Sequence, residues 1–201
     1  FEPLLGSGAI LGTLAPERGL AGDPFRPLIE IWSTLKRDPE LVSTWYAERY
    51  ALIARMGKKS AYEHVLASYN RSANGPDLLF LSRACYGGVV RFRKSDGYMS
   101  TPCGPHNPIP PVKFAQRAYE WHRRIAGTNF IHCDYRELLD QTRAGDIVYC
   151  DPPYSDSQSI LYGAQSFRLN DLYNSIAQCK ERGVFIALSI DGIKKSGKTI
   201  V

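Results

Sequence analysis

The most constraining feature of this chain is the way short apolar segments alternate with helix-like segments. The strand-like segments are residues 1–5, 20–23, 129–134, 146–151 and 184–191. Strands that follow one another through helices form parallel sheets that are covered by helices on both faces. We therefore predict an α/β fold with a doubly wound, Rossmann-like sheet.

A long helical region interrupts this alternation. Residues 26–126 carry helical patterns, apart from residues 87–104, where alternating side chains around Ser95-Asp96-Gly97 predict a β-hairpin. We therefore divide the chain into a discontinuous core, residues 1–25 and 127–201, and an insertion, residues 26–126. Because the chain starts within a predicted strand and stops at "SGKTIV", we expect it to be a piece of a longer protein.

The charge of the chain is concentrated in its middle. Residues 24–129 hold 16 Lys and Arg against 8 Asp and Glu, whereas the whole chain has a net charge of +5. Such a basic segment attracts polyanions, although a solvated surface explains the charge equally well. No apolar run approaches the roughly 20 residues of a membrane span. Five unclustered cysteines, with Cys103 and His106 as an isolated pair, predict an intracellular protein with reduced thiols and no metal site.

Small or acidic residues follow three of the predicted strands. Gly6-Ser7-Gly8 follows the first strand, and Asp23 and Asp134 end the second and third. Ligands of such sheets bind beyond the carboxyl ends of the strands, where glycines allow close approach and carboxylates accept from nucleoside groups. The glycine spacing departs from the dinucleotide fingerprint, and either acid alone also suits a helix N-cap. The coincidence of all three favours a nucleoside site.

The sequence Asp151-Pro152-Pro153-Tyr154 ends the fourth predicted strand. The prolines hold the backbone extended, so the Asp151 carboxylate and the Pro152 carbonyl are two neighbouring acceptors. An amine on an aromatic ring offers two matching donors, and Tyr154 offers a face on which that ring can stack. Holding both hydrogens favours a pyramidal nitrogen, whose lone pair can attack a correctly placed methyl donor. The pattern therefore predicts an amino methyltransferase, with an exposed turn as the alternative.

Several segments resemble one family in their order along the chain. "EPLLGSGA", "GDPFRPLI", "FIHCDYRELL" and "DIVYCDPPY" are similar to the motifs of Dam-like α-class DNA adenine-N6 methyltransferases. "LFLSRACYGGVVRFRKSDGYMSTPCG" is similar to the insertion of that family. The resemblance covers almost the whole chain, and D-P-P-Y after an apolar strand is its most specific element. Leu4 departs from the usual phenylalanine, and Ser82 and Gly87 depart from the usual asparagines.

The resemblance implies methyl transfer from S-adenosylmethionine to N6 of an adenine flipped out of duplex DNA, in restriction–modification or genome marking. The catalytic residues it implies are Asp151, Pro152, Pro153 and Tyr154, with no metal. The cofactor-binding residues it implies are Glu2, Pro3, Leu5, Gly6, Ser7, Gly8, Ala9, Asp23, Asp134, Tyr135 and Asp151. It also implies a bacterial or phage-encoded cytoplasmic protein associated with the nucleoid, and we expect a monomer.

The insertion supplies the residues that the resemblance assigns to DNA. Arg91 matches the arginine of the family and suits a guanine edge, and Tyr86 beside Gly87 suits a wedge that replaces the flipped base. The expected phosphate contacts are Arg83, Arg93, Lys94 and Lys113. Tyr162 and Phe167 fall where the family closes a loop over the flipped base. For each of these residues, ordinary surface charge or core packing is the alternative.

Other functions stay open at this point. Methylation of cytosine N4 or of an RNA base would use the same acceptor geometry, and a silent DNA-binding relative would keep the pocket without the reaction. A nicotinamide-dependent oxidoreductase is disfavoured because the third glycine of its fingerprint is missing. A cognate restriction endonuclease is a partner that the sequence neither requires nor excludes.

Overall fold

The computed structural model describes residues 1–153 and 167–190. Strands β1 (Gly19–Asp23) and β2 (Thr128–His132) pair in parallel, with Gly19 opposite Thr128. Strands β3 (Ile147–Cys150) and β4 (Phe185–Leu188) also pair in parallel, with Ile147 opposite Phe185. The positions of these four predicted strands are confirmed. Residues 1–5, which were also predicted as a strand, form only an isolated parallel bridge from Glu2 to Ala21.

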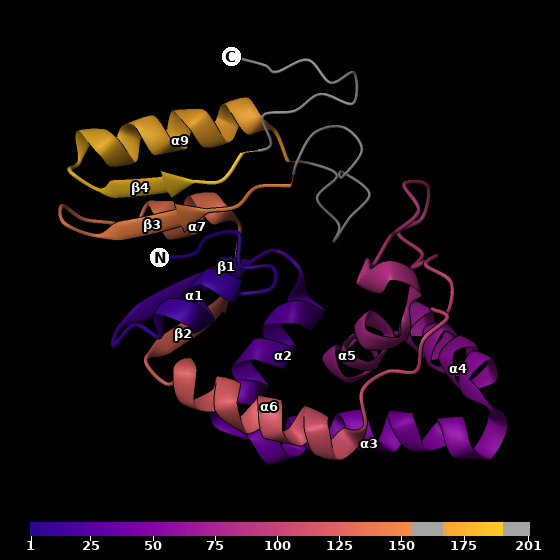
Figure 1. Ribbon diagram of the computed structural model, residues 1–201. Helices are drawn as coiled ribbons and strands as arrows, with labels where there is room; N and C mark the ends of the chain where they lie inside the picture. Colours follow the sequence, from indigo (N-terminus) through magenta and orange to yellow (C-terminus); the bar gives the residue numbers. More distant parts are fainter. Residues whose placement is uncertain (154–166, 191–201) are drawn as a thin grey trace.

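The first two residues of the chain connect the two strand pairs. The Glu2 amide donates to the Leu20 carbonyl, and the Gly22 amide donates to the Glu2 carbonyl, both at 3.0 Å. On the other side, the Tyr149 amide donates to the Phe1 carbonyl at 2.9 Å. Residues 1 and 2 therefore lie between β1 and β3, and the ends of β1, β2 and β3 lead to the same region of the molecule (Figure 1).

Helices make up most of the remaining structure. Their bounds are α1 (Ala9–Leu14), α2 (Arg26–Arg37), α3 (Pro39–Met56), α4 (Lys58–Arg71), α5 (Gly75–Ala84), α6 (Pro111–Arg124), α7 (Tyr135–Leu139) and α9 (Leu169–Glu181). Figure 1 shows α3, α4 and α5 gathered away from the strands, with α2 leading from β1 into this group and α6 leading back toward β2. We call α2 to α6 and the loops between them, residues 26–124, the helical region.

Local sequence signals explain where these helices begin. The Asp38 side chain accepts from the Leu41 amide at 2.9 Å, and Pro39 occupies the first turn of α3. The Asn74 side chain accepts from the Asp77 amide at the start of α5 in the same way. Such side-chain acceptors satisfy amides that have no partner within the helix.

The segment predicted as a hairpin lies between α5 and α6. Phe92 and Met99 form an antiparallel bridge, and the Arg93 amide donates to the Tyr98 carbonyl at 2.9 Å. Gly97 has a φ of 68° in the turn between them, which is the conformation expected of that glycine.

Two hydrophobic clusters hold the structure together. The larger one joins Leu5 and Ala21 beside the strands to buried residues of α2 to α6, such as Tyr46 and Phe80. The smaller one lies between β3, β4, α7 and α9 and includes Val148 and Leu172. The helical region therefore shares one core with β1 and β2.

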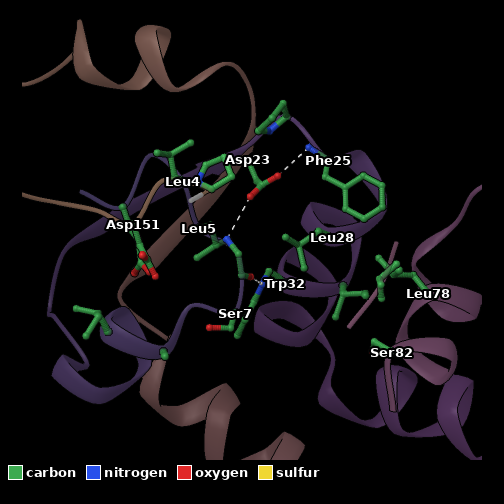
Figure 2. Close-up of a pocket in the computed structure, with 18 of the residues that line it drawn as sticks. Leu4, Leu5, Ser7, Asp23, Phe25, Leu28, Trp32, Leu78, Ser82 and Asp151 are labelled. Carbon is green, nitrogen blue, oxygen red and sulfur yellow. Dashed lines mark hydrogen bonds between the residues drawn. The ribbon is translucent and has the colours of Figure 1, made fainter. Parts of the chain in front are cut away.

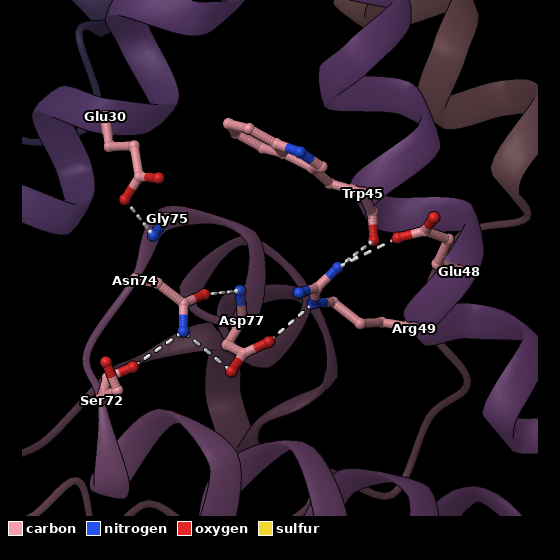
Figure 3. A network of polar contacts seen from close by, with 8 residues as sticks. All are labelled: Glu30, Trp45, Glu48, Arg49, Ser72, Asn74, Gly75 and Asp77. Carbon is pink, nitrogen blue, oxygen red and sulfur yellow. Dashed lines mark hydrogen bonds and ion pairs between the residues drawn. The ribbon is translucent and has the colours of Figure 1, made fainter.

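A buried polar network fixes α5 within the helical region (Figure 3). Asp77 is 4% exposed, and its carboxylate pairs with the Arg49 guanidinium of α3 at 2.7 Å. Its other oxygen accepts from the Asn74 side chain at 3.0 Å. Since a buried carboxylate is costly without such partners, this network sets the position of α5. Among the described helices, none has the length and apolar content needed to cross a membrane.

Candidate active site

One cavity of about 870 Å³ collects the polar groups that follow the strands. Gly6, Asp23, Asp134 and Asp151 all line it, although they are far apart in the sequence. Figure 2 shows Leu4 and Asp151 at one end of this cavity, and Leu78 and Ser82 of α5 at the other. The cavity thus extends from the strand ends into the helical region.

The glycine loop, residues 6–8, is held in shape by Asp23. The two oxygens of this carboxylate accept from the Gly6 amide at 3.1 Å and from the Phe25 amide at 2.9 Å (Figure 2). Burial raises the pKa of Asp23, while these two amides and His132 act to lower it. Each oxygen keeps a second lone pair, so Asp23 can hold the loop and still accept from a ligand hydroxyl.

Two glycines of this loop have different surroundings. Gly6 has a φ of 47°, and a Cβ added there would meet no atom within 4 Å. Gly8 has a φ of 59°, and a Cβ added there would lie 2.9 Å from the Trp32 ring. Both conformations favour glycine. Gly6 leaves room for a ligand to approach the backbone, whereas Gly8 lets the loop rest on Trp32.

Glu2 brings a second buried carboxylate to the cavity. It is 4% exposed, and its Oε2 accepts from the Leu11 amide of α1 at 3.0 Å. The pKa of Glu2 is raised to about 7, mainly by burial and to a smaller extent by the neighbouring Asp151, while the Leu11 amide and the Phe1 ammonium act to lower it. A cationic ligand in this cavity would therefore be attracted by Glu2 and would favour its ionised form.

Asp134 has a structural role that was the predicted alternative. Its side chain caps α7 in a capping box with Glu137, and its Oδ1 accepts from the Arg136 Nε at 2.7 Å. The Arg136 guanidinium lowers the pKa of Asp134. Tyr135 is buried and its ring contacts Phe167 edge-on at 5.8 Å, so Tyr135 also belongs to the smaller core.

The end of β3 presents the predicted methyl-acceptor residues. Asp151 is exposed and lines the cavity, Pro152 is buried, and Pro153 is half-buried and also lines the cavity. The structure therefore brings Asp151 to the space shared with the glycine loop. Tyr154 and Tyr162 lie outside the described residues.

Two arginines lie at the opposite end of the cavity. Arg83 of α5 was predicted to contact phosphate, whereas Arg117 of α6 was missed by the sequence analysis. Arg83 keeps contact with solvent, but its recessed position lowers the pKa of the guanidinium, and the positive charge of Arg117 adds to this shift. Neither arginine has an ion pair with a carboxylate in the described part of the chain. No sequence signal identifies Arg117, because only packing turns its face of α6 toward the cavity.

Phe167, which was also predicted to bind DNA, lines this cavity, whereas Tyr86, Gly87, Arg91, Arg93, Lys94 and Lys113 do not. Tyr86 is 58% exposed in the short 3-10 helix Tyr86–Gly88, where Gly87 has a φ of 65°. Arg91, Lys94 and Lys113 are exposed. Arg93 pairs with Asp96 at 2.6 Å and lies 4.2 Å above the Tyr98 ring, so its charge is partly used within the hairpin.

Metal-ligating residues do not cluster in the structure. In residues 1–153 and 167–190, no group of three or more His, Cys, Asp or Glu side chains is arranged to hold a metal ion. The cavity is lined by the glycine loop, by several carboxylates and by four arginines, Arg83, Arg117, Arg136 and Arg168, of which Arg136 pairs with Asp134.

Comparison with known proteins identifies relatives along almost the whole chain. A DNA adenine methylase of Vibrio cholerae is 26% identical over 94% of this chain and 70% of its own length. The retron Ec67 DNA adenine methylase of Escherichia coli is 29% identical over 86% of this chain and 60% of its own length. The type II methyltransferase M1.LlaDCHI of Lactococcus lactis is 24% identical over 94% of this chain.

The family assignment agrees with the geometry of the cavity. The model of one family matches residues 1–195, which includes the glycine loop, the helical region and the Asp151 segment. The chain belongs to the D12 class of N6 adenine-specific DNA methyltransferases.

Proposed function

We propose that this chain transfers a methyl group from S-adenosylmethionine to N6 of an adenine in duplex DNA. The observation that carries this proposal is the single cavity shared by Gly6, Asp23 and Asp151. It offers a loop for a nucleoside cofactor and an acceptor for an amine within one space. Its volume lies within the range of roughly 300–1,000 Å³ that is usual for ligand sites.

The residues around the glycine loop suit this cofactor. The backbone at Gly6 is open to the cavity, Glu2 and Asp151 provide negative charge, and Asp23 provides acceptors for a ribose. We propose the cofactor contacts Glu2, Pro3, Leu5, Gly6, Ser7, Gly8, Ala9, Asp23, Asp134, Tyr135 and Asp151. When bound, S-adenosylmethionine supplies a methyl group on a positively charged sulfur.

Asp151 is the residue that we propose to act on the amine. Its carboxylate accepts one N–H of adenine N6, and the Pro152 carbonyl accepts the other. This grip aligns the nitrogen for attack, and positioning supplies much of the rate of such a transfer. The nitrogen becomes acidic as it is alkylated, so Asp151 or water can take its proton. Tyr154, with Phe167 and Tyr162 nearby in sequence, is proposed to cover the ring.

The helical region is proposed to hold the DNA. An adenine inside a duplex cannot reach Asp151, so it must be extruded at a cost of a few kcal/mol. Tyr86 would fill the gap and Arg91 would read a base edge, while Arg83, Arg93, Lys94 and Lys113 would contact phosphates. The exposure of Tyr86, Arg91, Lys94 and Lys113 supports this surface.

The finer features of the fold and the setting are also proposals. The strands that we describe would belong to a doubly wound, Rossmann-like sheet, with a core of residues 1–25 and 127–201 and a target-recognition insertion at 26–126. Such a protein would act as a monomer in the cytoplasm of a bacterium or a phage host. The type II name of the Lactococcus lactis relative supports a restriction endonuclease as the partner.

The test is methyl transfer to DNA followed by identification of the product. Purified chain is incubated with duplex DNA and radiolabelled S-adenosylmethionine, and the DNA is digested to nucleosides for mass spectrometry. We expect N6-methyladenine. N4-methylcytosine, a product found only on RNA, or cofactor-independent DNA binding without any product would each contradict the proposal.

A further inference from the structure

Trp32 of α2 joins the glycine loop to the helical region. Its side chain is 8% exposed, and its indole Nε1 donates to the Gly6 carbonyl at 3.3 Å. Figure 2 shows Trp32 beside Leu5 and Ser7, with Asp23 above them. The loop is therefore held from two directions, by Asp23 through the Gly6 amide and by Trp32 through the Gly6 carbonyl.

The ring of Trp32 is itself fixed on several sides. It stacks on Phe130 of β2, with ring centroids 5.6 Å apart and an interplanar angle of 17°. It also packs against Trp121 of α6 at 5.4 Å. On the loop side, the space for a side chain at Gly8 is taken up by this ring. A movement of α2 would therefore move the surface on which the glycine loop rests.

The same helix is attached to α5. Glu30, two residues before Trp32, accepts from the Gly75 amide at 2.6 Å (Figure 3). This contact lies at the start of α5, where Asp77 and Arg49 already fix the helix. Arg83 near the end of α5 lines the cavity and is proposed to contact DNA. One continuous set of contacts thus connects Gly6, Trp32, Glu30 and α5.

We propose that Trp32 is a positioning residue that couples cofactor binding to DNA binding. It sets the Gly6 carbonyl in the cofactor loop, and α2 transmits the position of α5 to that loop. This inference rests on the proposed function, because it requires that both ligands bind at the two ends of the cavity. Coupling of this kind is reciprocal, so each ligand changes the affinity for the other by the same factor.

The experiment compares Trp32→Phe with the wild-type chain. Phenylalanine keeps a ring on Phe130 but cannot donate to Gly6. The matched control is Trp45→Phe on α3, since in the described residues the Trp45 indole has no hydrogen bond. Calorimetry measures the Kd of S-adenosylhomocysteine, the demethylated cofactor that cannot react, for each chain, without DNA and with sheared genomic duplex DNA. The ratio of the two Kd values is the coupling factor.

We expect Trp32→Phe to weaken cofactor binding about two- to tenfold, which corresponds to loss of one hydrogen bond. We also expect the coupling factor to move toward 1 in this variant and to stay at the wild-type value in Trp45→Phe. A lowered melting midpoint with an unchanged coupling factor would mean a merely structural role and would overturn the inference. A wild-type factor of 1 would also overturn it. If the wild-type chain bound no cofactor, the proposed function itself would fall with it.

Discussion

The two ends of the cavity differ in charge and in the kind of structure that carries the charge. The acidic end, with Glu2, Asp23 and Asp151, lies at the ends of strands or in loops next to them. The basic end, with Arg83 and Arg117, lies on the faces of two helices. Strand ends place a backbone group accurately, whereas a long side chain on a helix reaches its ligand with less precision. We therefore assign the chemistry to the acidic end and the affinity for DNA to the basic end.

The largest test of this division is Asp151→Ala. We expect methyl transfer to fall by about 10²- to 10⁴-fold, the usual contribution of a positioned acid–base group. Cofactor binding by calorimetry should fall far less than methyl transfer, because Glu2, Asp23 and the glycine loop remain. Asp140→Ala removes an exposed carboxylate outside the cavity and serves as the control. Full turnover in Asp151→Ala would show that the acidic end does not carry the reaction.

A smaller effect is expected for Gly8→Ala. The positive φ costs an alanine about 1–2 kcal/mol, and its Cβ would also displace the Trp32 ring. We expect cofactor binding to weaken about tenfold or more, with a lower melting midpoint. Gly87→Ala has the same kind of backbone cost, with a φ of 65° and a ψ of 6°, but open space around it. Equal cofactor affinity in the two variants would show that the Trp32 contact does not shape the site.

Arg117→Ala tests the basic end. Loss of one phosphate contact should weaken DNA binding about tenfold and reduce the salt dependence of the affinity by about one unit of slope. Cofactor binding in the absence of DNA should stay at the wild-type value. Arg71→Ala, at the exposed end of α4, provides the control. If Arg117→Ala weakened cofactor binding instead, the arginine would hold the carboxylate of the cofactor and the two ends would not be separate.

The smallest effect concerns pH. Because the pKa of Glu2 is raised to about 7, its carboxyl is protonated below that pH and ionised above it. A cationic cofactor favours the ionised form, so its affinity should rise a few-fold from pH 6 to pH 8 and then level off. Glu2→Gln keeps an acceptor for the Leu11 amide but cannot titrate, and the rise should disappear. The same rise in Glu2→Gln would assign it to another group.

Burial of Glu2 has the opposite consequence for the free protein. When the pKa of a carboxyl is higher in the folded than in the unfolded protein, the folded state loses stability as the pH rises from the unfolded pKa to the folded pKa. The free energy of unfolding without ligand should therefore decrease from about pH 5 to pH 7, and Glu2→Gln should reduce that decrease. Burial of Glu2 thus costs the free protein stability, and a positively charged ligand at the acidic end would offset this cost.

The sequence alone determined the four paired strands, the starts of helices such as α3 and α5, and the polar groups that follow the strands. These features depend on neighbouring residues: apolar runs that bury, Asp38 and Asn74 that cap helices, and prolines that fix the backbone after Asp151. Its position after a strand and before a helix predicted two roles for Asp134, a nucleoside acceptor and a helix N-cap. The structure shows the capping role directly.

Only the tertiary structure decided which of these polar groups line the same cavity and which other residues surround them. Trp32 and Arg117 carried no local signal, since a tryptophan or an arginine on a helix has many uses. Their roles depend on the packing of α2 against the strands and of α6 against α2 and α3. This packing brings residues nearly 100 positions apart into contact, as with Trp32 and Phe130. Adjacent residues determine strands, helix caps and the backbone after a strand. The charge and shape of a cavity depend on segments that are distant in the sequence, and only their packing fixes their relative positions.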